Sequence, residues 1–190
     1  LKPAMGCTEP IALAYAAAKA REVLGCIPDK VEIGASGSII KNVKSVIVPN
    51  TDHLKGIPAA ATAGIIAGDA SKELEVIANV APGKTAEMRE FLEKTPITVE
   101  FVDNGFVFEI IVKVSKGDSY AKVRIVNYHT NIILIEKDGE KLFFTAYDIS
   151  KYFMSIYSLR SYIDAKYRNI IYTNFFIIKN KNRLRKFSDF

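Results

Sequence analysis

The clearest change in the spacing of apolar residues along the chain lies near Pro96. Several stretches before this point have apolar residues at helical spacing, whereas apolar and polar residues alternate with a period of two after it. The alternating part predicts about five strands, at residues 97–101, 106–114, 120–126, 131–136 and 141–145. Asp103-Asn104-Gly105 predicts a hairpin turn between the first two. We therefore expect an α+β protein in which N-terminal helices pack with an antiparallel β-meander.

The first half of the chain predicts four helices and two short strands. The first helix spans residues 8–24, with Thr8 as its N-cap, Pro10 in its first turn and Gly25 just past its end. Its many alanines would let another element pack closely. Strands are expected at 30–35 and 44–48 with a loop between them, and further helices at 58–68, 71–79 and 85–94.

The composition changes after about residue 149, which predicts a domain at residues 1–147 and a basic, aromatic tail at 148–190. Residues 151–190 contain no Gly or Pro, ten of the twenty Tyr and Phe residues, and nine Lys or Arg against two Asp or Glu. An amphipathic helix, out-of-frame translation and a nucleic-acid surface are the alternatives for this tail. The net charge of +5 belongs to it, so nucleic acid is not an expected partner of the remainder.

The compartment follows from cysteine use and hydropathy. Cys7 and Cys26 have no Cys-x-x-Cys spacing, and no apolar run reaches the roughly 20 residues of a membrane span. We expect free thiols, no membrane partner and a cytoplasmic location.

Lys41, near Ser36 and Ser38, is the one candidate for a Schiff-base lysine, and pyridoxal phosphate is not expected.

Cys7 is the main candidate for chemistry because it directly precedes the first predicted helix. The positive end of the helix dipole would lower the pKa of its thiol and attract a substrate carboxylate. A buried structural thiol is the alternative. Glu9 is either a catalytic acid or a first-turn partner of the dipole, and His129 lies at a strand boundary, where a turn and a ligand site are both consistent with its neighbours.

The opening residues carry a family resemblance. Residues 2–14, KPAMGCTEPIALA, resemble the opening signature of the L-cysteine desulfidase family, which is related to the α chain of iron–sulfur L-serine dehydratases. Further short matches follow in order across residues 1–147: Lys41-Asn42, Val48-Pro49, GIPAAA at 56–61, and HTNI at 129–132 running into Ile135-Glu136.

This resemblance implies a lyase. In the family a 4Fe–4S cluster assists β-elimination from L-cysteine or L-serine, giving pyruvate and ammonia, with sulfide from cysteine. It implies that Cys7 and Glu9 are catalytic, and that Cys7 is also a candidate metal ligand. The implied substrate-binding residues are Thr8, Asn42, His129 and Asn131.

The departures from the family pattern limit this expectation. Family members are longer, and their other cluster-binding cysteines lie in a C-terminal half that has no counterpart here. We therefore expect a truncated N-terminal part that is inactive and binds no cluster alone, with a cysteine-rich C-terminal chain as partner. The alternatives are a non-catalytic amino-acid-binding module and an accessory subunit of a split enzyme. Whether the chain is itself an enzyme, and whether it forms a homo-oligomer, stay open.

Overall fold

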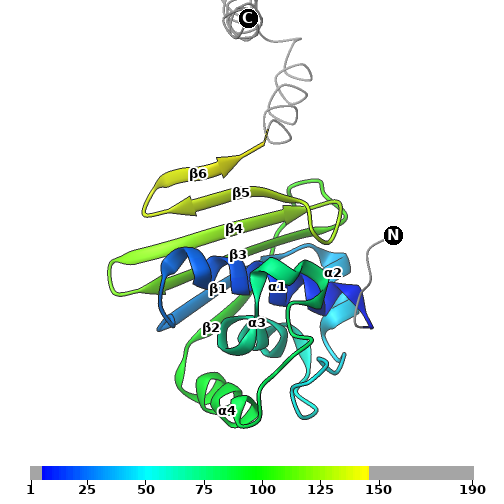
Figure 1. Ribbon diagram of the computed structural model, residues 1–190. Coiled ribbons are helices and arrows are strands. Elements are labelled where there is room, and N and C mark those ends of the chain that lie inside the picture. The colour runs from blue at the N-terminus through cyan, green and yellow to red at the C-terminus, as the bar shows by residue number, and fades with distance from the viewer. Residues whose placement is uncertain (1–5, 146–190) are drawn as a thin grey trace, which may run out of the picture. The chain divides into compact units, whose positions relative to one another are not determined.

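The computed structural model describes residues 6–145 (Figure 1). The predictions made for the tail at 148–190, and the part of the opening signature before Gly6, lie outside the described residues. Within the described part, helices precede and cover a six-stranded mixed sheet. The α+β class predicted from the change of period is confirmed.

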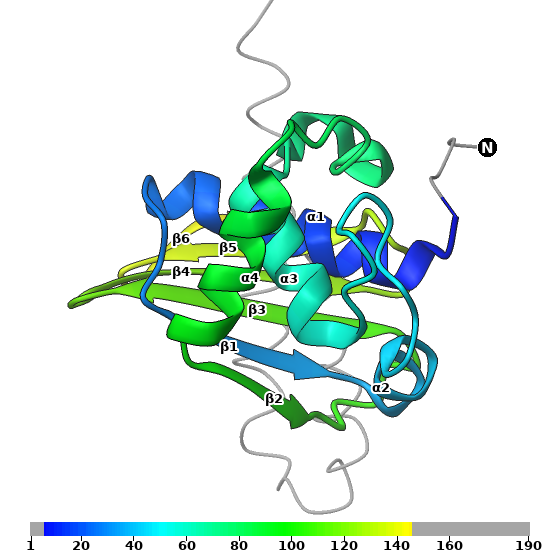
Figure 2. The ribbon, with the colours of Figure 1, turned by 90° about the horizontal axis from the view of Figure 1, so that it is seen from below.

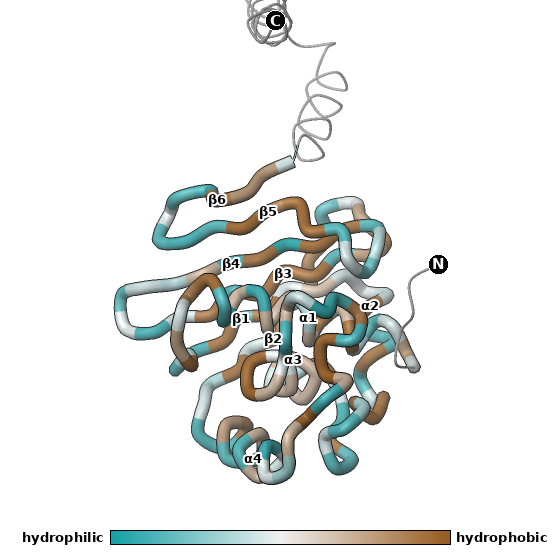
Figure 3. Tube along the Cα trace, viewed as in Figure 1, coloured by the Kyte–Doolittle hydropathy of each residue, from teal (hydrophilic) through white to brown (hydrophobic). Residues whose placement is uncertain are grey.

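The sheet has the strand order β2-β1-β3-β4-β5-β6. Four neighbouring pairs are antiparallel, and β3 to β6 follow one another as the predicted meander. Figure 3 shows the alternation of polar and apolar positions along β4. The strands are β1 (Lys30–Ala35), β2 (Ile97–Phe101), β3 (Glu109–Lys116), β4 (Ser119–Val126), β5 (Ile132–Lys137) and β6 (Glu140–Phe144).

The predicted hairpin between β2 and β3 is wrong, because β1 lies between them. Ile33 of β1 pairs in parallel with Val99 of β2 and in antiparallel with Val112 of β3. The inward face of β1 is almost completely buried, and insertion between two strands satisfies its backbone groups on both sides. Residues 103–105 thus connect strands that are not neighbours.

Three other local predictions also differ from the structure. The expected loop after residue 35 contains α2 (Gly37–Val43), and the expected strand at 44–48 is reduced to one isolated bridge between Ile47 and Lys55. Ile39 and Val43 are both buried, and their spacing of four residues fits one face of a helix. The helix expected at 71–79 is a shorter 3-10 helix, η1 (Ala70–Glu75).

Helices α1 (Thr8–Leu24) and α3 (Gly56–Ala67) form the core on one face of the sheet, with α4 (Lys84–Lys94) beyond α3 (Figure 2). α1 and α3 pack very closely: a Cβ atom built on Gly64 would lie 2.0 Å from the carbonyl oxygen of Ala14. Arg21 of α1 donates to the carbonyl oxygen of Gly68 at 2.6 Å. Gly68 is the C-cap of α3, so this hydrogen bond links α1 to the C-terminal end of α3. Among residues 6–145, no helix is long and apolar enough to cross a membrane.

Candidate active site at the start of the first helix

Several segments that are far apart in sequence meet at one end of the sheet. The start of α1, the helix α2, the start of β3 and the loop between β4 and β5 all lie at this end (Figure 1). They bring together five of the six residues that the sequence singled out: Cys7, Thr8, Glu9, Asn42 and His129.

Cys7 is the N-cap of α1, a position that the sequence assigned to Thr8. Its backbone is extended, with φ −63° and ψ 121°, and its side chain makes no hydrogen bond to the first-turn N–H groups. Instead the thiol donates to Oε2 of Glu9, 3.2 Å away. The Thr8 hydroxyl donates to the same oxygen at 3.4 Å. The thiol is therefore hydrogen-bonded to a carboxylate.

The predicted low pKa of Cys7 is wrong. Although the residue is exposed, neighbouring atoms remove part of the water around the thiol, and this partial burial raises its pKa. The hydrogen bond to Glu9 and the negative charge of Glu9 raise the pKa further, because both favour the protonated thiol. In this arrangement Cys7 is held as a thiol.

Glu9 is the centre of the cluster. Its Oε1 accepts a hydrogen bond from Nδ2 of Asn42 at 3.3 Å, which links α1 to α2. The hydrogen bond from Cys7 is the main cause that lowers the pKa of Glu9. Asn42 and the nearby His129 also lower it, while burial opposes them. The carboxylate is therefore ionised at neutral pH and supplies the negative charge of the site.

His129 approaches the cluster from the loop between β4 and β5. Its ring packs edge-on against Phe108, with ring centres 4.6 Å apart and an interplanar angle of 62°. Its Nε2 atom is buried and has no hydrogen-bond partner in the part of the chain that the structure describes. Burial lowers the pKa of His129, and the charge of Glu9 partly offsets that effect. A neutral imidazole with one unused nitrogen results.

Asn131 does not join this cluster. Its Nδ2 donates to the carbonyl oxygen of Val126 at 3.0 Å, and its backbone N–H donates to the carbonyl oxygen of Tyr128 at 3.0 Å. The side chain therefore stabilises the loop that carries His129.

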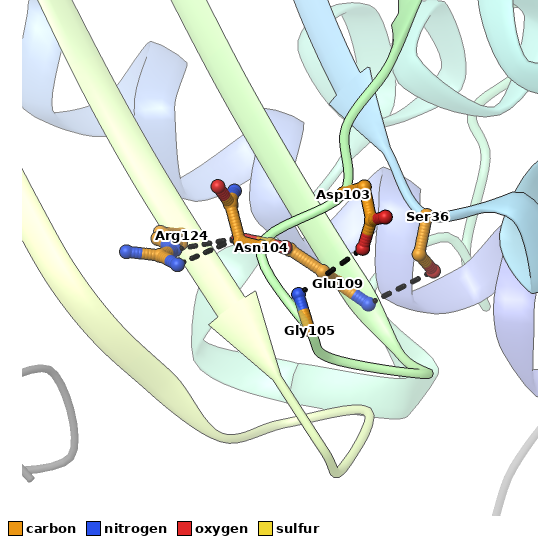
Figure 4. Close-up of polar contacts among 6 residues, drawn as sticks. All are labelled: Ser36, Asp103, Asn104, Gly105, Glu109 and Arg124. Carbon is orange, nitrogen blue, oxygen red and sulfur yellow. Dashed lines mark hydrogen bonds and ion pairs between the residues drawn. The ribbon is translucent and has the colours of Figure 1, made fainter. Parts of the chain in front are cut away.

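A buried ion pair beside the cluster was not predicted (Figure 4). Glu109 has no solvent exposure, and its Oε1 accepts from Nε of Arg124 at 2.8 Å and from Nδ2 of Asn104 at 3.0 Å. Ser36 adds two backbone contacts: its Oγ accepts from the N–H of Glu109 at 3.2 Å, and its own N–H donates to the carbonyl oxygen of Glu109 at 3.0 Å. A carboxylate directly before an apolar run was the only available signal in the sequence.

Few side chains at this site could bind a metal ion. Within residues 6–145 no group of three or more His, Cys, Asp or Glu side chains is arranged to hold a metal ion. A 4Fe–4S cluster is held by about four thiolates, and Cys7 is the one thiol at this site. The residues described here thus do not by themselves fit such a cluster.

Comparison with known proteins gives the relatives of the chain. No protein-family model matches it. A protein of Desulfitobacterium hafniense is 56% identical over 145 residues, which are 76% of this chain and 34% of the relative. A protein of Lachnoclostridium phytofermentans is 49% identical over 139 residues, 73% of this chain and 33% of that protein. Both carry the name UPF0597 protein.

The chain is similar to UPF0597 proteins. One from Treponema denticola is 43% identical over 143 residues, 75% of this chain and 33% of the relative. The chain therefore spans about one third of the length of the UPF0597 relatives that it matches. The name UPF0597 states neither a substrate nor a reaction.

The L-cysteine desulfidase family assignment made from the opening signature is wrong. It depended on a few short matches, whereas the UPF0597 proteins align over about 140 residues at 43–56% identity. An alignment of that extent outweighs short motifs.

Proposed function

We propose that the start of α1 forms part of an active site that eliminates the β-substituent of a small L-amino acid such as L-cysteine or L-serine. The observation that carries the proposal is the convergence of Cys7, Glu9, Asn42 and His129 from three separate segments. A proton-carrying thiol, an ionised carboxylate and a neutral imidazole are the groups that acid–base chemistry uses.

The cluster offers a binding group for each end of an amino acid. The ionised Glu9 would attract the substrate ammonium, and the N–H groups at the start of α1 would attract its carboxylate. Asn42 holds the Glu9 carboxylate from α2 and would fix its orientation.

Substrate binding would also activate the base. The charge of Glu9 is one of the causes that raise the pKa of Cys7, and a bound ammonium would neutralise that charge. The exposed thiol would then lose its proton to bulk water more readily, and the thiolate would take the Cα proton and become a thiol again. The electron pair of the Cα–H bond forms the Cα–Cβ double bond, and the bond from Cβ to sulfur or oxygen breaks with its pair on the leaving atom, which takes a proton from water. The resulting enamine tautomerises to an imine, which water converts to pyruvate and ammonia.

The rest of the proposal concerns the longer protein that the UPF0597 relatives represent. We propose that the longer protein uses a 4Fe–4S cluster, contains a cysteine-rich segment and is cytoplasmic. We propose neither pyridoxal phosphate as its cofactor nor nucleic acid as its partner. The cluster would take its remaining thiolates from outside residues 6–145, and no step above depends on it.

A non-catalytic amino-acid-binding module is the second candidate. The raised pKa of Cys7 favours it, because a protonated thiol is a hydrogen-bond donor rather than a base. In that case Glu9 and the α1 start would bind the amino acid and no bond would break.

Pyruvate formation tests the lyase proposal. The protein for the test is a chimera, prepared without oxygen, in which residues 1–145 of this chain replace the matched stretch of the Desulfitobacterium hafniense relative. We expect pyruvate from L-cysteine or L-serine, and we expect Cys7→Ser to lower kcat by about 10²–10⁴-fold, the range of general acid–base catalysis. Cys26→Ser, at the chain's other cysteine, is the matched control and should leave kcat unchanged. Full turnover in Cys7→Ser would exclude Cys7 as the base, and absence of pyruvate with both substrates would exclude the lyase.

A further inference from the structure

The most exposed large apolar side chains of residues 6–145 gather around the candidate site. They are Val107 at 82%, Tyr128 at 70% and Phe101 at 64% exposed. We call these three residues the apolar rim. Exposed apolar residues that cluster in this way mark interaction surfaces more often than scattered ones do.

The apolar rim follows the segments that build the site. A Cβ atom built on Gly37 would meet the ring of Phe101 at 3.5 Å, so the end of β2 lies against the start of α2. The hydroxyl groups of Ser36 and Ser38 donate to the carbonyl oxygen of Val107, Ser36 at 2.8 Å, which fixes the backbone there and leaves the side chain outside. Figure 2 shows β2 ending beside α2.

Tyr128 completes the apolar rim next to His129. The N–H of Asn127 donates to the carbonyl oxygen of Phe108 at 3.0 Å, and Phe108 packs against the His129 ring. The segments that carry Val107 and Tyr128 therefore contact each other through their neighbours Phe108, Asn127 and His129. Cys7 and Asn42 are exposed beside them, so the rim borders an open site.

We infer that the apolar rim is the surface on which the rest of a UPF0597 protein docks, closing the site of the proposed function. The relatives contain about two thirds of their length beyond the part that this chain matches, so a large polypeptide is available to cover it. Elimination chemistry benefits when water is excluded from the reacting groups. Exposed apolar side chains of this size fit a polypeptide with a complementary apolar face.

Labelling with a maleimide tests this docking. Val107→Cys is placed in two proteins: the full chain, and the chimera described above, both with Cys7→Ser and Cys26→Ser. Lys116→Cys is the matched control, because Lys116 ends the strand that Val107 precedes and its side chain is 53% exposed. Peptide mass spectrometry follows each introduced thiol separately from the cysteines of the relative.

We expect fast labelling of residue 107 in the full chain and labelling about tenfold slower or more in the chimera, because access limits the reaction. Residue 116 should label at the same rate in both proteins. Equal rates for residue 107 in the two proteins would overturn the inference. Protection in the full chain that grows with its concentration would also overturn it, since the occupant would then be a second copy. The readout involves no substrate, so it is independent of whether the lyase or the binding proposal holds.

Discussion

Cys7 and Glu9 are two residues apart, and the ionisation of each depends on the other. The thiol donates to the carboxylate, which lowers the pKa of Glu9 and contributes to the raised pKa of Cys7. The negative charge of Glu9 thus opposes the effect that the α1 dipole alone would have on the thiol.

Glu9→Gln tests this coupling in the chain itself. The substitution removes the negative charge and the carboxylate acceptor, so the pKa of Cys7 should fall and its alkylation by iodoacetamide near pH 8 should become faster. The pH dependence of the rate, measured on the Cys7 peptide in a Cys26→Ser background, gives the shift. Glu22→Gln, farther along α1, should leave the profile unchanged. A slower reaction in Glu9→Gln would contradict the assignment.

The lowered pKa of His129 predicts that the free energy of unfolding depends on pH in the acidic range. Its pKa is lower in the folded protein than the unfolded value of about 6.5, so the unfolded chain binds more protons below that pH. The free energy of unfolding should therefore fall as the pH decreases from about 6.5 towards the folded pKa. Urea denaturation at several pH values should show a smaller decrease for His129→Gln. His53→Gln, the chain's other histidine, is the control, and a flattened profile there instead would exclude His129 as the cause.

At the scale of elements, the close approach of α1 and α3 holds the helical layer together. Gly64→Ala would place its Cβ 2.0 Å from the Ala14 carbonyl oxygen and would push the helices apart. We expect a loss of about 3 kcal/mol in the free energy of unfolding, as for overpacked cores. Gly37→Ala, where the new Cβ meets only Phe101 at 3.5 Å, should be tolerated. Equal urea midpoints for the two variants would contradict this packing.

The Glu109–Arg124 pair fixes the strand ends that carry the site. Removing one partner of a buried ion pair costs about 3–5 kcal/mol, so Glu109→Gln should destabilise the protein strongly. The double variant Glu109→Leu with Arg124→Met should recover part of the loss, because no unpaired buried charge remains. Glu100→Gln, at an exposed position on β2, should change the free energy of unfolding little. A double variant that is no more stable than Glu109→Gln would contradict this explanation of the loss.

At the scale of the whole molecule, the local sequence pattern predicted most helices and strands but not which distant strands pair. The alternation after Pro96 predicted the β3–β6 meander, and the helix-start residues predicted α1 almost to its bounds. Insertion of β1 between β2 and β3 depends on contacts between residues more than 60 positions apart, which no local period encodes. α2 spans seven residues, too few for a clear helical period.

In the candidate site, too, local features could be predicted from the sequence and long-range contacts could not. Cys7 and Glu9 were found because a thiol and a carboxylate at a helix start have a physical signature, and Asn42 and His129 because short motifs pointed to them. The raised pKa of Cys7 could not be predicted from the helix dipole alone, because it depends first on the partial burial of the thiol and then on the hydrogen bond and charge of Glu9. Glu109 and Arg124 meet only across the β3–β4 pairing, so their contact could not be read before the register was known.

Calorimetric titration of L-serine into the full chain tests most directly the central claim that the start of α1 is an amino-acid site. We expect binding heat with a Kd in the millimolar range, about −4 kcal/mol, since only part of the longer protein is present. Glu9→Gln should abolish the heat and Glu22→Gln should retain it. Heat of the same size in Glu9→Gln, or no heat in the unmodified chain at several times that concentration, would contradict the account.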